Sequence, residues 1–135
     1  MDVKVKLDFR TDPRGTLVPI EGGRTIPFEI KRVYYLVGMS SDQPRGFHAH
    51  KKLVQFAICV SGSCEMHLDF GDRKEVVKLV KPTEGVLIKE MVWHEMHNFA
   101  PGTVLVVFAS DYYDEKDYIR DYNDFLRLAH DSSQQ

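Results

Sequence analysis

The sequence predicts an all-β sandwich or barrel followed by one C-terminal helix. Short runs rich in Val, Ile, Phe and Tyr recur along most of the chain, and Gly, Pro, Asp and Ser separate them, which is typical of such folds. The composition of the 135 residues, 43% hydrophobic and 28% charged, is that of a globular chain and not of a disordered one. We therefore expect one domain, residues 1–135, with one core.

Nine segments have the composition of strands, and tight turns of Gly, Pro, Asp and Ser join several of them. The expected strands are Val3–Phe9, Thr16–Ile20, Glu29–Val37, Leu53–Val60, Glu65–Phe70, Glu75–Val80, Gly85–Lys89, Val92–Asn98 and Thr103–Ala109. The turns are Asp12-Pro13-Arg14-Gly15, Ser61-Gly62-Ser63, Gly71-Asp72 and Pro101-Gly102.

The C-terminal segment has helical spacing instead. Its apolar residues fall on one face of a helix: Tyr118, Tyr122, Phe125, Leu126 and Ala129. Asp114 and Asp117 precede them, and acidic groups are favoured where a helix begins. The pattern predicts one terminal helix of about twelve residues, a common length.

Charge and hydropathy argue against several classes of partner. The net charge of −2 gives no general attraction to nucleic acid or to an anionic membrane. No apolar stretch approaches the roughly 18 residues that span a bilayer, and Met1–Arg10 alternates charged with apolar residues. We expect a cytoplasmic protein that binds neither nucleic acid nor membrane.

The two cysteines, Cys59 and Cys64, flank the Ser-Gly turn. They could face each other across a hairpin, where a disulfide is conceivable. Because the sequence has neither a secretory signal nor a Cys-rich framework, we expect both to be reduced and mostly buried.

A pair of histidines is the strongest chemical signal in the sequence. His48 and His50 are separated by one residue, and such residues project to the same face of an extended chain. Histidine has an ordinary pKa of about 6.5, so it exchanges protons near neutral pH. The pair suits either proton transfer or metal binding.

The spacing around this pair resembles the cupin superfamily of jelly-roll β-barrels. Four residues separate His50 from Gln55, and six more precede Gly62, which is the register of the first cupin motif. His94 is followed after three residues by Asn98, as at the end of the second motif, whose Pro-x-Gly part is absent. The resemblance predicts a cupin-type barrel.

Gln55 occupies the place where metal-binding cupins usually have Glu. A divalent ion gains much of its affinity from an anionic carboxylate, and Gln supplies no charge. Three imidazoles, those of His48, His50 and His94, could still hold a transition metal. We expect no metal and no cofactor, and the metal-binding alternative stays open.

Four longer segments resemble the dTDP-4-keto-6-deoxyglucose 3,4-ketoisomerases, which are WxcM-like cupins, and the similarity runs from about Asp12 to Leu126. These segments are Asp12-Pro13-Arg14-Gly15, Pro27-Phe28-Glu29-Ile30-Lys31-Arg32-Val33-Tyr34-Tyr35, Arg45-Gly46-Phe47-His48-Ala49-His50-Lys51 and Ser110-Asp111-Tyr112-Tyr113-Asp114. The resemblance implies a metal-free homodimer that exchanges strands. It also implies a dTDP-linked 4-keto-6-deoxy sugar as substrate and proton transfer by His48 and His50.

The reaction implied by the resemblance moves a ketone from C4 to C3 through an enediol, on the way to 3-amino or 3-acetamido deoxysugars. An enediolate needs a donor near the developing oxygen charge, and the candidates are Arg45 and Tyr35, although Tyr34 has the opposite strand phase. Arginines suit the diphosphate, and Tyr112 or Tyr113 could stack on thymine. The expected substrate-binding residues are Arg14, Arg32, Tyr35, Arg45, Gln55, Trp93, His94, Tyr113 and Arg120.

Two other functions are compatible with this fold. A sugar-nucleotide 3,5-epimerase typically pairs one His with a Tyr acid, so the tight His48/His50 pair favours the ketoisomerase. A sugar-binding cupin without catalysis, attached to an acyl- or aminotransferase partner, is the third hypothesis. The configuration at C4 of the product and the division of labour between the two histidines stay open.

Overall fold

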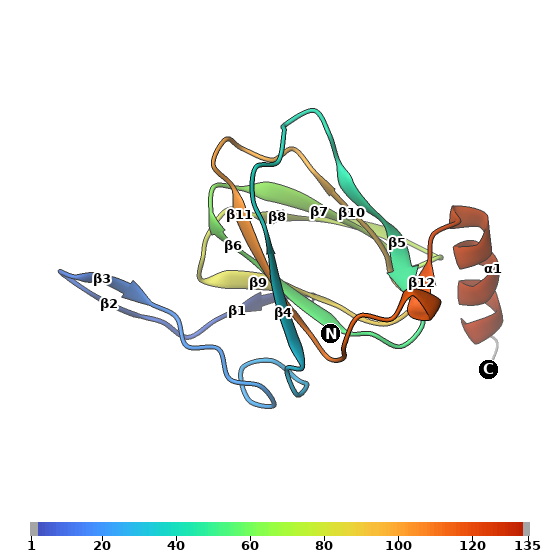
Figure 1. Ribbon diagram of the computed structural model, residues 1–135, viewed down its shortest axis with the longest axis horizontal. Helices are drawn as coiled ribbons and strands as arrows, with labels where there is room; N and C mark the ends of the chain where they lie inside the picture. The colour runs from blue at the N-terminus through green and yellow to red at the C-terminus, as the bar shows by residue number, and fades with distance from the viewer. Residues whose placement is uncertain (1–2, 134–135) are drawn as a thin grey trace.

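Two five-stranded antiparallel sheets face each other and form the body of the protein (Figure 1). The computed structural model describes residues 3–133. The first sheet has the order β1 (Lys4–Lys6), β9 (Glu84–Ile88), β6 (Gln55–Ser61), β11 (Val104–Ala109) and β4 (Arg32–Leu36). The second has the order β12 (Tyr118–Ile119), β5 (Arg45–His50), β10 (Trp93–His97), β7 (Cys64–Asp69) and β8 (Lys74–Leu79). The predicted all-β cupin-type architecture is confirmed.

A small hairpin projects from this body on the side opposite the C-terminal helix (Figure 1). It consists of β2 (Arg10–Asp12) and β3 (Gly15–Leu17), and every residue of both strands is exposed. Asp12 closes the turn, because its carboxylate accepts a hydrogen bond of 2.8 Å from the backbone amide of Arg14. The turn was predicted, but a hairpin with no apolar face of its own was not.

The main core fills the space between the two sheets. Strand β6 is apolar almost throughout because both of its faces are buried. Ala57 and Cys59 pack in the main core, whereas Phe56 and Ile58 pack on the other face against Leu7, Ile26 and Leu87. Because both faces of β6 are covered, period-two alternation is absent there.

Cys59 and Cys64 lie in consecutive strands of opposite sheets. A hairpin between them, which the sequence left possible, does not form, because the chain crosses from one sheet to the other at Gly62. Both cysteines are free and buried in the main core, as predicted for reduced residues. A Cβ at Gly62 would lie 2.4 Å from Oγ1 of Thr103, so this crossing requires glycine.

The C-terminal helix α1 (Tyr122–Ser133) has the predicted length of twelve residues but begins later than expected. Asp121 lies before it, and its carboxylate accepts a hydrogen bond from the amide of Asp124. Asp114 instead caps a short 3₁₀ turn, η1 (Glu115–Asp117). Tyr118 was wrongly assigned to the helix, because β12 pairs with β5 and buries Ile119 beside the helix.

All nine predicted strand segments overlap strands, and three strands were missed: β2, β5 and β12. Strand β5 was missed because its inward-facing side chains are polar, so it lacks the apolar alternation by which strands are found. No helix within residues 3–133 is long and apolar enough to cross a membrane.

Candidate active site

Three histidines meet on the inner face of the second sheet. His48 on β5 lies directly opposite His94 on β10, and His50 follows two residues later on the same face. The ring centroid of His48 lies 5.1 Å from that of His50 and 4.6 Å from that of His94. The spacing of His48 and His50 had predicted this common face.

Backbone carbonyls determine which nitrogen of two rings carries the hydrogen. Nδ1 of His48 lies 3.1 Å from the carbonyl oxygen of Gly46, and Nδ1 of His94 lies 3.3 Å from that of Val92. A carbonyl oxygen only accepts, so Nδ1 is the protonated nitrogen in both neutral rings. Nε2 of each ring then has a free lone pair that can accept a proton.

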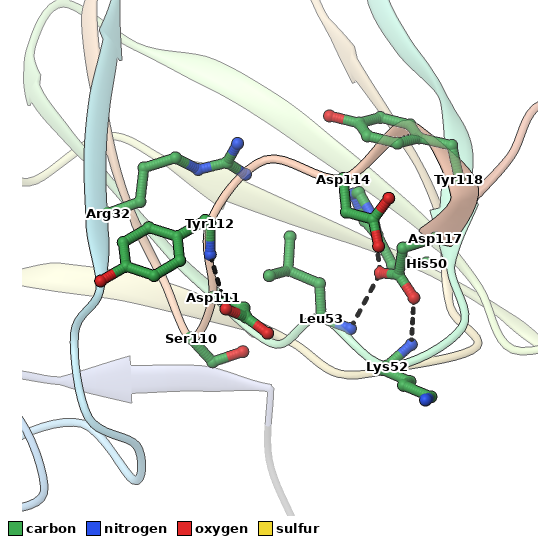
Figure 2. A pocket seen from close by; sticks show the side chains of 10 residues that line it. All are labelled: Arg32, His50, Lys52, Leu53, Ser110, Asp111, Tyr112, Asp114, Asp117 and Tyr118. Atoms are coloured by element: carbon green, nitrogen blue, oxygen red, sulfur yellow. Dashed lines mark hydrogen bonds and ion pairs between the residues drawn. The ribbon is translucent and has the colours of Figure 1, made fainter.

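His50 lies against a carboxylate that the sequence did not reveal. Its Nδ1 is 3.3 Å from Oδ2 of Asp117, and the ring is 3% exposed. The backbone amides of Lys52 and Leu53 donate to the same carboxylate over 2.9 and 3.1 Å (Figure 2). Two amides therefore fix Asp117 beside His50, where its negative charge stabilises a protonated imidazole.

The surroundings keep these imidazoles neutral at neutral pH. Burial, followed by the charge of His48, lowers the pKa of His94 to about 3. Burial and the charge of His48 also lower the pKa of His50 to about 4, although Asp117 opposes the shift. Burial lowers the pKa of His48 as well. A neutral imidazole is the form that can act as a general base.

Tyr34, not Tyr35, faces the interior of the barrel. Its hydroxyl oxygen accepts a hydrogen bond of 2.7 Å from Nε2 of Gln55, which leaves its own O–H free to donate. Burial raises the pKa of Tyr34 to about 12, so the phenol stays protonated. Tyr35 lies on the outer face, 68% exposed, and the structure does not bring it to the histidines.

A pocket of about 120 Å³ opens beside His50 (Figure 2). Its walls come from β4, from the end of β5 and the loop after it, and from the segment that leads from β11 into β12: Arg32, His50, Lys52, Leu53, Ser110, Asp111, Tyr112, Asp114, Asp117 and Tyr118. The ring of Tyr118 lies 4.9 Å from that of His48 and 4.4 Å from that of His50, between centroids. Tyr118 therefore covers both histidines.

Two arginines flank the histidines in different ways. The guanidinium of Arg32 lies over the rings of Tyr34 and Tyr113, at 5.3 and 5.8 Å, and its charge lowers the pKa of His50. Arg120 lies 4.2 Å from the ring centroid of Tyr118. Of the predicted cations, Arg32 thus lines the pocket and Arg120 lies at its rim.

Glu115 connects the residues of this rim. Arg120 donates two hydrogen bonds to it, of 2.9 and 2.8 Å, and the hydroxyl of Tyr113 donates a third. The Arg120 guanidinium, together with Tyr113, lowers the pKa of Glu115 to about 2. Glu115 therefore already balances the charge of Arg120, and Tyr113 is linked to the pocket through its contacts with Tyr118 and Arg32.

The structure places two predicted residues away from the histidines of their own chain. Trp93 lies on the outer face of β10, because its neighbour His94 faces inward, and its ring packs 5.3 Å from Tyr122 and 5.9 Å from Phe125. It therefore supports the helix and does not form a wall of the pocket. Arg14 is at the turn of the exposed hairpin, ion-paired with Asp12.

Sequence reasoning missed Asp117 and Tyr118 and left Tyr34 undecided. Asp117 and Tyr118 were assigned to the start of the helix, so nothing connected them with β5. The available signal was the apolar pair Tyr118-Ile119 after an acidic turn, which is consistent with a short strand as well as with a helix. For Tyr34, only the register of β4 against β11 decides the facing side.

The histidine cluster also has the geometry of a metal site. One ring nitrogen from each of His48, His50 and His94 lies within 4.8 Å of the other two. Three imidazoles fit a transition metal, which would polarise a substrate oxygen as a Lewis acid. The buried Gln55 brings no negative charge to this donor set.

A family model described as "FdtA: WxcM-like, C-terminal" matches residues 1–130. The chain belongs to this family. It is 52% identical, over 86% of its length and 84% of the relative, to the TDP-4-oxo-6-deoxy-alpha-D-glucose-3,4-oxoisomerase of Aneurinibacillus thermoaerophilus. These matches confirm the family that the sequence motifs indicated.

Solved structures of 3,4-ketoisomerases superimpose on nearly the whole chain. A 3,4-ketoisomerase from Helicobacter canadensis is 45% identical, with a TM-score of 0.91, covering 94% of this chain and 96% of that one. A variant of the 3,4-ketoisomerase QdtA from Thermoanaerobacterium thermosaccharolyticum, in complex with TDP-4-keto-6-deoxyglucose, is 44% identical, with a TM-score of 0.92 and coverages of 95% and 93%. The cupin-type fold and the expected enzyme class, a 3,4-ketoisomerase, are confirmed.

Proposed function

We propose that this WxcM-like protein moves the ketone of dTDP-4-keto-6-deoxyglucose from C4 to C3. The observation that carries the proposal is the pair of adjacent neutral imidazoles, His48 and His50, inside a barrel that also holds the inward-facing hydroxyl of Tyr34, free to donate. The names of the relatives support the reaction, and the bound sugar nucleotide of the QdtA variant supports the substrate.

The reaction needs four proton movements and neither gains nor loses atoms. A base removes the proton from C3 while O4 receives one, which gives the enediol. O3 then loses its proton while C4 receives one, which leaves the ketone at C3. Two imidazoles that are neutral at the start can accept the carbon proton and return it, because each exchanges protons near neutral pH.

The surroundings of the two histidines favour different roles. His48 is half-buried, and its free Nε2 suits it to accept the proton of C3. His50 is buried against Asp117, whose charge stabilises the imidazolium, so it suits the role of taking up the proton that O3 loses and delivering a proton to C4. This division follows the logic of a carboxylate that orients a histidine and stabilises its charged form.

Tyr34 and Arg45 supply the groups that an enediolate requires. The O–H of Tyr34 can donate to the developing oxygen charge, since Gln55 already occupies its acceptor side. The positive charge of Arg45 reaches the same phenol, whose pKa it lowers against the dominant effect of burial. Arg32, whose Nε is buried without a hydrogen-bond partner among residues 3–133, is the cation that we assign to the diphosphate.

We further propose that the working unit is a homodimer that exchanges strands. The pocket beside His50 is about 120 Å³, below the roughly 300–1,000 Å³ of typical ligand sites, so a nucleotide sugar needs further walls. The exposed β2–β3 hairpin carries Arg14 at the end of the molecule opposite η1 and α1 (Figure 1). Such a hairpin can bring Arg14 to the diphosphate only in the site of a partner subunit.

The product has chemistry that defines the next step. A ketone at C3 is the group that an aminotransferase converts to an amine, so the proposed reaction serves the synthesis of 3-amino and 3-acetamido deoxysugars.

NMR in D2O tests the function directly. The purified protein is incubated with dTDP-4-keto-6-deoxyglucose, and the signals at C3, C4 and C5 are followed. We expect the ketone to appear at C3 with deuterium at C4. Deuterium at C5 would indicate a 3,5-epimerase instead, and a substrate without any exchange would indicate a sugar-binding module.

A further inference from the structure

Strand β5 contains a bulge immediately before the histidine pair. His48 pairs with His94, but Gly46 pairs with the next residue of β10, Glu95, so Phe47 is an extra residue on β5. Both bulge residues have positive φ, 96° at Gly46 and 62° at Phe47. A glycine at positive φ is the usual first residue of one class of bulge, whereas a phenylalanine there is an outlier.

The bulge decides which way Arg45 faces. In a regular strand Arg45, three positions before His48, would lie on the opposite face. Because Gly46 and Phe47 together oppose one residue, Arg45 pairs with Met96 instead. Directly paired residues share a face, and Met96 belongs to the core between the sheets. The Cα–Cβ bond of Arg45 is therefore on the same face of the sheet as His48 and His50.

Two further observations concern the residues that form the bulge, Gly46 and Phe47. A Cβ at Gly46 would lie 2.8 Å from the carbonyl oxygen of His94, so the close approach of β5 and β10 requires glycine. The ring of Phe47 points to the outer face, where it meets the ring of His97 edge-on with centroids 5.9 Å apart. Phe47 thus lies on the side away from the pocket and touches neither catalytic histidine through its ring.

We propose that the Gly46–Phe47 bulge is a positioning element that turns Arg45 into the active site, where Arg45 binds the nucleotide sugar. The inference rests on the proposed function for the identity of the ligand. Phe47 is a positioning residue, because as the extra residue of β5 it shifts the pairing with β10 and so determines the face on which Arg45 lies. The proximity of Arg45 to Tyr34, whose pKa it lowers, supports the inward placement.

Substitutions at Phe47 test the backbone requirement separately from the loss of the ring. Phe47→Gly removes the side chain and accepts positive φ, and Phe47→Asn also accepts it, whereas Phe47→Ile is β-branched and does not. The measurement is the Kd for TDP-glucose, a stable nucleotide sugar, by calorimetry. We expect Phe47→Ile to raise Kd by about tenfold or more, as Arg45→Ala does, and Phe47→Gly and Phe47→Asn to stay within about threefold of the parent.

A double variant and a deletion make the test independent of folding yield. If Arg45 has left the site, Arg45→Ala adds no further loss of affinity in the Phe47→Ile background. Deleting Phe47 restores regular pairing with Arg45 still opposite Met96, so we expect this variant to keep the affinity that Phe47→Ile loses. A crystal structure of Phe47→Ile should show Arg45 on the outer face.

Three results would overturn the inference: wild-type affinity in Arg45→Ala, an unchanged effect of Arg45→Ala in the Phe47→Ile protein, or an inward Arg45 in its crystal structure. These results concern binding and geometry, so they are distinct from a failure of the isomerase reaction. A protein that binds TDP-glucose through Arg45 but does not isomerise the keto sugar would contradict the proposed function and leave the positioning role supported.

Discussion

The hydroxyl of Tyr34 accepts a hydrogen bond of 2.7 Å from the side-chain amide of Gln55. Gln55 stands where metal-binding cupins usually have a carboxylate ligand, and here its amide orients a phenol. The substitution therefore has a structural role of its own besides removing a negative charge. Because the oxygen of Tyr34 accepts this bond, its own O–H stays free to donate.

Tyr34→Phe should lower kcat by about 10²-fold, because it removes one donor to the enediolate oxygen. Tyr35→Phe is the matched control, since Tyr35 is adjacent in the chain but lies on the outer face. We expect it to keep nearly full turnover. Equal losses in the two variants, measured by NMR of the ketone signals, would contradict the assignment of Tyr34.

His48→Asn and His50→Asn should each lose turnover by roughly 10²- to 10⁴-fold, the usual contribution of a general acid or base. Both variants should fold normally, because Asn keeps a polar group in place of the ring. Single-turnover NMR in D2O and circular dichroism check the two expectations. Full activity in either variant would remove that histidine from the mechanism.

Asp117→Asn should lower kcat by about 10- to 100-fold, as expected for loss of a group that orients a catalytic histidine. The negative charge of Asp117 raises the pKa of His50 against the effect of burial, so its removal lowers that pKa further. The acid limb of the kcat profile should then move to lower pH. Asp124→Asn, on the exposed face of α1, is the control, and an unmoved acid limb in Asp117→Asn would contradict the coupling.

Acid should destabilise the protein below pH 6.5. The folded state lowers the pKa of His50 to about 4 and that of His94 to about 3, whereas unfolding restores values near 6.5. The unfolded chain therefore binds more protons between these values, and the free energy of unfolding falls as pH decreases. Each histidine should contribute a loss of roughly 2 kcal/mol between pH 7 and pH 5.

Urea unfolding at the two pH values measures this loss. His50→Asn should reduce the pH dependence, because it removes one of the two buried imidazoles that the unfolded chain protonates. The same pH dependence in His50→Asn and the parent protein would show that His50 is not held neutral by the fold.

Turnover should be insensitive to chelators. The proton transfers are assigned to His48, His50 and Tyr34, and Gln55 gives the three imidazoles no anionic co-ligand. We expect metal analysis of the purified protein to find far less than one ion per chain. Activity that is abolished by a chelator and restored by one divalent ion would establish the metal-dependent alternative.

The sequence was sufficient for the fold class and for the histidine pair, because both depend on local patterns. Alternating apolar runs predicted strands, and the one-residue spacing of His48 and His50 predicted their common face. Local patterns could not show which residues of β4 face the interior of the barrel. Both Tyr34 and Tyr35 are amphipathic, and only the register against β11 separates them.

Long-range pairing accounts for the remaining errors. Asp117 reaches His50 because β12 adds to the edge of β5, a contact between segments more than sixty residues apart in the chain. Helical spacing around Tyr122 extended by chance to Tyr118, so the local pattern favoured an earlier helix start. The pairing of Arg45 with Met96 depends on a bulge, which strict alternation does not predict.

The packing of α1 has a practical consequence for anyone who modifies this protein. Phe125 is fully buried behind β5, in the same apolar cluster as Ala49 and Ile119. Ala49 lies between His48 and His50 in the chain. The packing of α1 against Ala49 therefore supports the backbone that carries both imidazoles. Truncation before Tyr122 would remove this support, so any modification of the protein should keep the helix.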